Sequence, residues 1–154
     1  MEIKELLEKA TMGDANAQNN LGDYYLVGQG VEQNFKEAVS WYTKAALQGI
    51  ADAQVTLGLC YEAGEGVEQN DKEAVKWYTK ATLQGNADAQ HNLGRCYEFG
   101  GGVEQNFKEA MQWYTKAYKS GYNDAKTKLI KFYINGYGCK RNYDKAMEIF
   151  QATK

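Results

Sequence analysis

The sequence lacks proline altogether, and among its 154 residues it has only one histidine and three cysteines. So few cysteines cannot build the dense disulfide framework of a small secreted protein. No segment approaches the roughly 18 consecutive apolar residues of a membrane-spanning helix. The first residues, Met1 to Leu7, are acidic and amphipathic, whereas a signal peptide is basic and then apolar. We therefore expect a cytoplasmic protein, although a secretion signal removed earlier would leave the same sequence.

An excess of charge of either sign is also missing. The 18 basic residues nearly balance the 20 acidic ones, and the net charge is −2. No overall basic field exists to attract nucleic acid or an anionic membrane, so we expect neither as a partner. Apolar residues make up 44% and charged residues 25%, which is ordinary globular composition. A chain of this length buries about two-thirds of its surface, enough for a core without disulfides or metal.

Glycine, by contrast, is abundant, and its spacing is regular. A Leu-Gly pair recurs every 36 residues, and the fourth copy has Leu129 followed by Ile130. The segments 31–49 and 67–85 are identical at 16 of 19 positions. Each copy must therefore have the same structure as the next. We predict a single domain over 1–154, with a capping helix at 1–13 and four repeats at 14–49, 50–85, 86–121 and 122–154.

Each repeat carries two amphipathic helical patterns. In the first, Ala17, Leu21 and Tyr25 share one helical face, and Gly28 follows as a left-handed C-cap. In the second, Asn34 stands where an N-cap residue is favoured. No segment alternates with the period of two that is typical of strands. The pattern predicts an all-α protein in which helix pairs stack on one another.

The repeated residues A-D-A-Q-x-x-L-G-x-C-Y-E-x-G-x-G-V-x-x-N-x-K-E-A-x-x-W-Y-T-K-A resemble the Sel-one-like repeat family, which is related to tetratricopeptide repeats. The resemblance runs from Asp14 to Lys154. It implies a right-handed α/α superhelix, or solenoid, that serves as a protein-interaction adaptor. Some secreted relatives carry two bridged cysteines per repeat and are linked to penicillin-like ligands. That cysteine pattern is absent from this sequence.

Candidate catalytic and metal sites are few. The Gly28-Gln29-Gly30 segment and its copies could be mistaken for phosphate-binding loops, but such a loop follows a strand and does not recur in every repeat. His91 lies five residues before Cys96, about 140° away around one helix. Cys60 and Cys96, one repeat apart, should lie about 10 Å from each other, beyond the roughly 7 Å limit for a disulfide. We expect three thiols, no metal, no cofactor and no enzymatic activity.

Binding residues are expected where the copies differ. In tetratricopeptide-like stacks the first helices line a concave groove, and their outward positions here are chemically mixed. Asparagines can bond to a peptide backbone, apolar side chains can pack against it, and basic side chains can meet a carboxylate. The candidate binding residues are Asn19, Asn20, Asp23, Val55, Thr56, Leu59, His91, Asn92, Arg95, Phe99, Lys128 and Lys131.

The predicted function is therefore a non-enzymatic scaffold that binds a peptide or protein segment in this groove. Two alternatives remain, a structural or designed repeat array without ligand and a small-molecule-binding or hydrolytic family member. Charge is unevenly placed, because residues 122–154 carry +4 and residues 1–121 carry −6. We expect a monomer, with weak head-to-tail self-association as the alternative.

Overall fold

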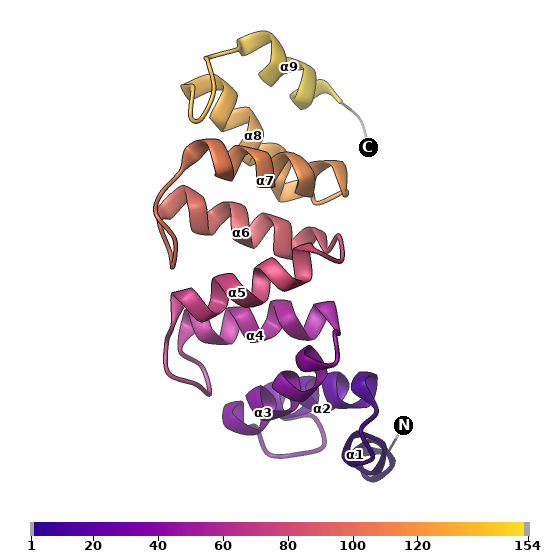
Figure 1. Cartoon of the computed structure of the whole chain (residues 1–154). Coiled ribbons are helices and arrows are strands. Elements are labelled where there is room, and N and C mark those ends of the chain that lie inside the picture. Colours follow the sequence, from indigo (N-terminus) through magenta and orange to yellow (C-terminus); the bar gives the residue numbers. More distant parts are fainter. Residues whose placement is uncertain (1, 153–154) are drawn as a thin grey trace. The chain divides into compact units, whose positions relative to one another are not determined.

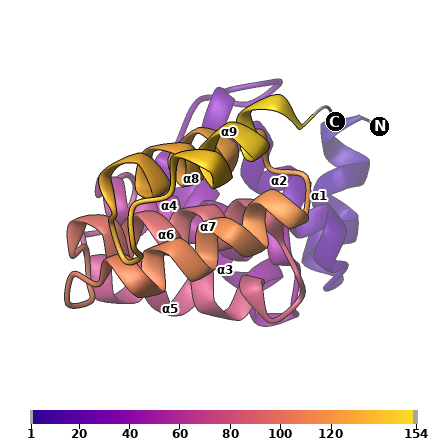
Figure 2. The same ribbon diagram turned by 90° about the horizontal axis from the view of Figure 1, so that it is seen from above.

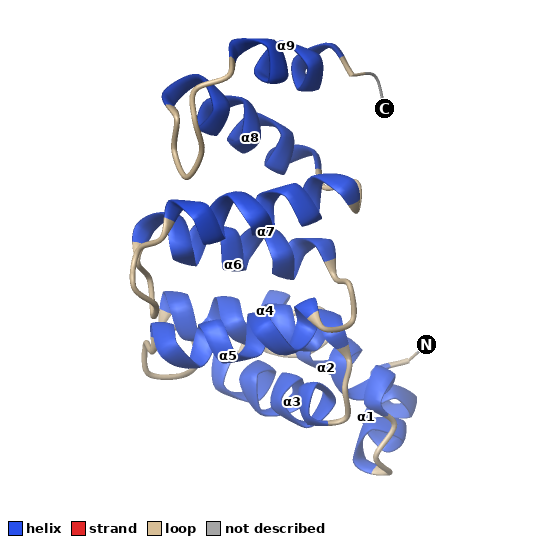
Figure 3. Cartoon of the chain, turned by 45° about the horizontal axis from the view of Figure 1, so that its top comes forward, coloured by secondary structure: helices blue, strands red, loops and turns tan. Residues whose placement is uncertain are grey.

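The computed structural model describes residues 2–152, and within that range every regular element is a helix (Figure 3). The prediction of an all-α protein with two helices per repeat is confirmed. The helices are α1 (Ile3–Thr11), α2 (Ala15–Val27), α3 (Phe35–Leu47), α4 (Ala51–Ala63), α5 (Asp71–Thr82), α6 (Ala87–Phe99), α7 (Phe107–Lys119), α8 (Asn123–Asn135) and α9 (Tyr143–Gln151).

The chain divides into two compact units, one ending at Ala81 and the other beginning at Thr82. In the first unit, α2 packs against both α1 and α3, and α3 packs against α4. In the second unit, α6 packs against α7, α7 against α8, and α8 against α9, so that successive helices lie side by side (Figures 1 and 2). This neighbour-to-neighbour packing is the arrangement that the repeat predicts.

The helix ends follow the local sequence signals. Gly28 and Gly100 both adopt φ +74° after α2 and α6, and their backbone N–H groups bond to Tyr24 O and Cys96 O. The carboxamide oxygen of Asn34 accepts a hydrogen bond from the backbone N–H of Glu37, and Asn106 does the same for Glu109. These caps satisfy backbone groups that the helices leave without partners.

The core of each unit is built from small residues and buried tyrosines. Tyr42, Tyr78 and Tyr114 are fully buried, and each lies against the glycine of a Leu-Gly pair. Alanines at the other contact positions let the helix axes approach closely. Trp77 is 9% exposed and belongs to the core of the first unit. Leu6 of α1 packs on α2, so the first helix covers one face of that helix.

Among residues 2–152 no helix is both long enough and apolar enough to cross a membrane.

Candidate functional site

A tyrosine from the second helix of each of the first three repeats donates its hydroxyl to a carboxylate on the preceding helix. Tyr42 bonds to Asp23 at 2.7 Å, Tyr78 to Glu62 at 2.7 Å and Tyr114 to Glu98 at 2.5 Å. Burial raises the pKa of Tyr42 and of Tyr114, and the acceptor carboxylates raise them further. These hydroxyls therefore stay protonated and hold the carboxylates in place.

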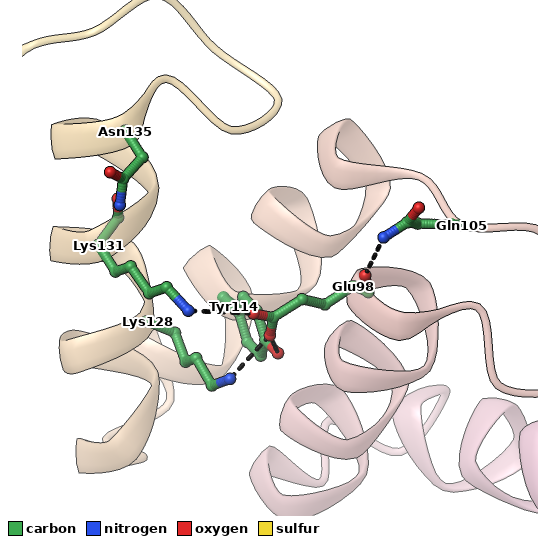
Figure 4. Close-up of polar contacts among 6 residues, drawn as sticks. All are labelled: Glu98, Gln105, Tyr114, Lys128, Lys131 and Asn135. Atoms are coloured by element: carbon green, nitrogen blue, oxygen red, sulfur yellow. Dashed lines mark hydrogen bonds and ion pairs between the residues drawn. The ribbon is translucent and has the colours of Figure 1, made fainter.

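In the second unit, Glu98 joins α6 to α8 (Figure 4). Its side chain is only 4% exposed and accepts bonds from both Tyr114 and Lys128, the latter at 2.8 Å. The ammonium of Lys131 lies 3.9 Å from the other carboxylate oxygen. A buried carboxylate is costly unless charged or polar partners surround it. Glu98 meets that requirement with groups from two other helices.

Lys128 is thus occupied within the chain. The groove hypothesis counted Lys128 as added positive charge for a partner, whereas here it neutralises Glu98 and its ammonium lies 5.2 Å from the ring centroid of Phe99. Lys131 is different, because its side chain is 53% exposed and its contact with Glu98 is long. Phe99 is 66% exposed beside Lys128. The surface therefore offers an exposed apolar ring next to the ammonium of Lys128.

Two candidate binding residues do not lie on the surface. His91 is 9% exposed and Val55 is 8% exposed, so the prediction that they face outward is wrong. His91 lies between the rings of Tyr114 and Tyr122, with centroids 5.3 Å and 4.6 Å away. These rings come from the neighbouring helix and from the following loop, which a single-helix pattern does not show.

Burial sets the chemistry of His91. Its Nδ1 is buried and has no hydrogen-bond partner among residues 2–152. Burial lowers the pKa of His91, and the nearby positive charges of Lys128 and Arg95 lower it further against the opposing effect of Asp124 and Glu98. The imidazole is therefore held neutral as part of the packing.

The other candidates keep at least part of their surface. Asn20 and Asp23 line a hollow of about 400 Å³ together with Leu6 and Tyr24, all in the first unit.

Glu98 is the functional residue that sequence reasoning missed. The sequence signal that could have revealed Glu98 is the tyrosine that recurs in the second helix of each of the first three repeats, together with an acidic residue on the helix before it. The exposed candidates are Asn20, Asp23, Leu59, Phe99 and Lys131, and the half-buried ones are Asn19, Thr56, Asn92, Arg95 and Lys128.

The cysteines offer no reactive centre among the described residues. Cys60 and Cys96 are buried and Cys139 is half-buried, all three as thiols. Burial raises the pKa of Cys60 to about 11, which suppresses the reactive thiolate. Within residues 2–152 no three acidic, cysteine or histidine side chains lie close enough together to hold a metal ion.

Comparison with protein families gives four matches to the Sel1 repeat model, at residues 15–50, 51–86, 87–122 and 131–152. The chain belongs to the Sel1 repeat family. The resemblance drawn from the sequence is therefore confirmed. Sel1 repeat proteins are generally protein-interaction scaffolds.

Solved structures of Sel1 repeat proteins are similar along nearly the whole chain. The crystal structure of c5321, a protective antigen of uropathogenic Escherichia coli with an SLR fold, is 36% identical with a TM-score of 0.93, over 95% of this chain and 31% of that one. A Sel1 repeat protein from Oxalobacter formigenes is 41% identical with a TM-score of 0.89, over 96% of this chain and 61% of that one. This chain thus spans about a third of the length of the E. coli protein and about three-fifths of the length of the O. formigenes protein.

A more distant structure shares the fold alone. Helicobacter pylori cysteine rich protein B is 23% identical with a TM-score of 0.65, over 82% of this chain and 91% of that one. A search of curated proteins finds no match.

Proposed function

We propose that this Sel1 repeat protein is a protein-interaction scaffold that binds a segment of a partner protein through the first helices of its repeats. In the second unit the binding surface is the α6–α8 face, defined by Asn92, Arg95, Phe99, Lys128 and Lys131. The observation that carries the proposal is Phe99, a large apolar side chain left 66% exposed beside Lys128. An exposed aromatic ring flanked by basic groups is typical of protein interfaces.

The chemistry of the face favours an acidic segment. Two basic side chains of α8 approach Glu98: Lys128 donates to its carboxylate together with Tyr114, and Lys131 lies 3.9 Å from the other oxygen. Lys131 has the more exposed side chain of this pair, 53% against 25% for Lys128, and its contact with Glu98 is long. Asn92 can donate to and accept from an extended backbone. A partner segment with a carboxylate near Lys131 and an apolar residue on Phe99 satisfies all of these groups.

The experiment is affinity purification with mass spectrometry, followed by calorimetric titration with the captured segment. We expect Arg95→Glu combined with Lys131→Glu to abolish binding, because removal of an interfacial charge pair costs about 2–5 kcal/mol when the pair is buried. Asn92→Ala should weaken binding modestly, by about 1 kcal/mol for a lost hydrogen bond. Added salt should also weaken binding of an acidic segment.

The control makes the same kind of charge reversal at two lysines on second helices. Lys36 and Lys76 are exposed on α3 and α5, so Lys36→Glu combined with Lys76→Glu should leave the affinity unchanged. Binding that survives the Arg95 and Lys131 reversals but is lost with the control pair would place the interaction on the second helices and contradict the proposal.

A further inference from the structure

Among residues 2–152, α8 and α9 line an apolar groove that no other described helix covers, which we name the α8–α9 groove. It has a volume of about 310 Å³. Four of its side chains are large, apolar and exposed: Ile134 at 40%, Tyr143 at 63%, Met147 at 54% and Phe150 at 66%. The complete lining is Ile130, Ile134, Tyr143, Ala146, Met147 and Phe150.

The preceding repeat shows what covers such a groove. The residues 36 positions before Tyr143 and Phe150 are Phe107 and Tyr114. There α8 lies over them, with the Phe132 ring centroid 6.0 Å from Phe107 and 5.5 Å from Tyr114. Under that cover Tyr114 is fully buried. The same positions on α9 lack a covering helix among the described residues.

The fourth repeat also has two apolar residues where the third repeat has a hydrogen-bonded tyrosine and glutamate. Tyr114 and Glu98, which bond to each other in the third repeat, correspond to Phe150 and Ile134. The exchange removes a hydroxyl and a carboxylate from the wall of the groove. An apolar wall of this size favours an apolar occupant over water.

We propose that the α8–α9 groove binds a helix of a partner protein that resembles a first helix of a Sel1 repeat, with an aromatic side chain on its apolar face and acidic residues at its flanks. The aromatic side chain takes the place over Phe150 that Phe132 takes over Tyr114. The acidic flanks follow from the charge of this end, where residues 122–152 carry six basic and three acidic side chains. The same excess positive charge opposes a second copy docking groove to groove.

The probe is a helix-stabilised peptide with the sequence of residues 14–30. It has two aspartates and no basic residue, and Tyr24 occupies the position of Phe132 in its repeat. We expect it to bind the full chain in fluorescence anisotropy titrations. Phe150→Glu should weaken binding at least about tenfold, since burial of one aromatic anchor carries that much affinity. Met147→Glu provides a second test on the same helix.

Controls match each element of the claim. Leu47→Glu alters a leucine that is 69% exposed and lies outside the groove. The affinity of this variant for the peptide should equal that of the unmodified chain. Peptides with Tyr24→Ser, or with both aspartates replaced by lysine, should bind more weakly. The α6–α8 face variants Arg95→Glu and Lys131→Glu test the proposed function separately, because the partner segment captured there is a different ligand.

Three results would overturn the inference. The first is no peptide binding up to about 1 mM, the weakest affinity that is useful to measure. The second is binding that Phe150→Glu and Met147→Glu leave unchanged. The third is a dimer in sedimentation equilibrium that depends on Phe150 and excludes the peptide, which would make a second copy the occupant.

Discussion

At the scale of single residues, the buried tyrosines combine a packing role with a polar one. Tyr42 and Tyr114 are both fully buried, yet their hydroxyls bond to carboxylates in different surroundings. Asp23 is exposed, whereas Glu98 is only 4% exposed. Water can replace a lost hydroxyl at Asp23 but not at Glu98. Equivalent positions in the repeat therefore differ in what they contribute to stability.

Tyr114→Phe tests this difference. Removal of the hydroxyl leaves buried Glu98 with one donor fewer, and a hydrogen bond to a charged group contributes about 1.5–3 kcal/mol. Tyr42→Phe is the matched control and should lower the free energy of unfolding by less than about 1 kcal/mol, because Asp23 regains water. Urea denaturation of both variants measures the difference. Equal losses would show that burial of the acceptor does not set the contribution of this bond.

His91 should make stability depend on pH. Its pKa in the folded protein is lowered from 6.5 by burial and by Lys128, so the folded state favours the neutral ring. As the pH falls through 6.5, the unfolded chain binds a proton that the folded chain resists, and stability is lost. Between about pH 7.5 and pH 5.5 the free energy of unfolding should therefore fall more for the unmodified chain than for His91→Asn. Parallel pH profiles for the two proteins would contradict this assignment.

At the scale of helices, close packing depends on a glycine facing a tyrosine. A Cβ placed on Gly58 of α4 would lie 2.5 Å from a ring carbon of Tyr78 on α5. Tyr78 is fully buried, so its ring has little room to move. The Leu-Gly pair in the sequence thus marks the point where two helices touch. In the fourth repeat Ile130 replaces this glycine, and Phe150 replaces the tyrosine and lies exposed.

Gly58→Ala should separate α4 from α5. Overpacking of a buried contact costs about 1–3 kcal/mol, and the lost helix-interior glycine recovers up to about 1 kcal/mol of that. Gly101→Ala is the control, because a Cβ there would meet nothing within 4 Å. Thermal unfolding should show a lower midpoint for Gly58→Ala and an unchanged one for Gly101→Ala. A Gly58→Ala protein as stable as the original would mean that the tyrosine ring can shift without cost.

At the scale of the whole molecule, charge distinguishes the two units. Residues 1–81 carry a net charge of −6 and residues 82–154 carry +4. The near-neutral total therefore conceals two opposite fields, each extending about 10 Å in moderate salt. Both proposed surfaces of the second unit, the α6–α8 face and the α8–α9 groove, lie in its positive field. An acidic partner fits either surface for the same electrostatic reason.

The sequence by itself determined the repeat, the two helices in each copy and their caps. These features depend on interactions within about one helical turn or on exact repetition, both of which are visible in the order of residues. Asn34 and Gly28, for example, end their helices where the pattern places them. The handedness of the predicted superhelix and the concave groove along all four repeats stay predictions.

Only the tertiary structure decided the burial of His91 and Val55 and the pairing of Lys128 with Glu98. The burial of His91 and the pairing of Lys128 depend on side chains from another helix or loop, and a helical face read from one segment cannot show which neighbour covers its flank. Tyr122 shields His91 from a loop 31 residues away, and Glu98 neutralises a lysine 30 residues further along the chain. The difference is one of range, because local hydrogen bonding is encoded in adjacent residues, whereas burial and charge pairing arise only when separate helices meet.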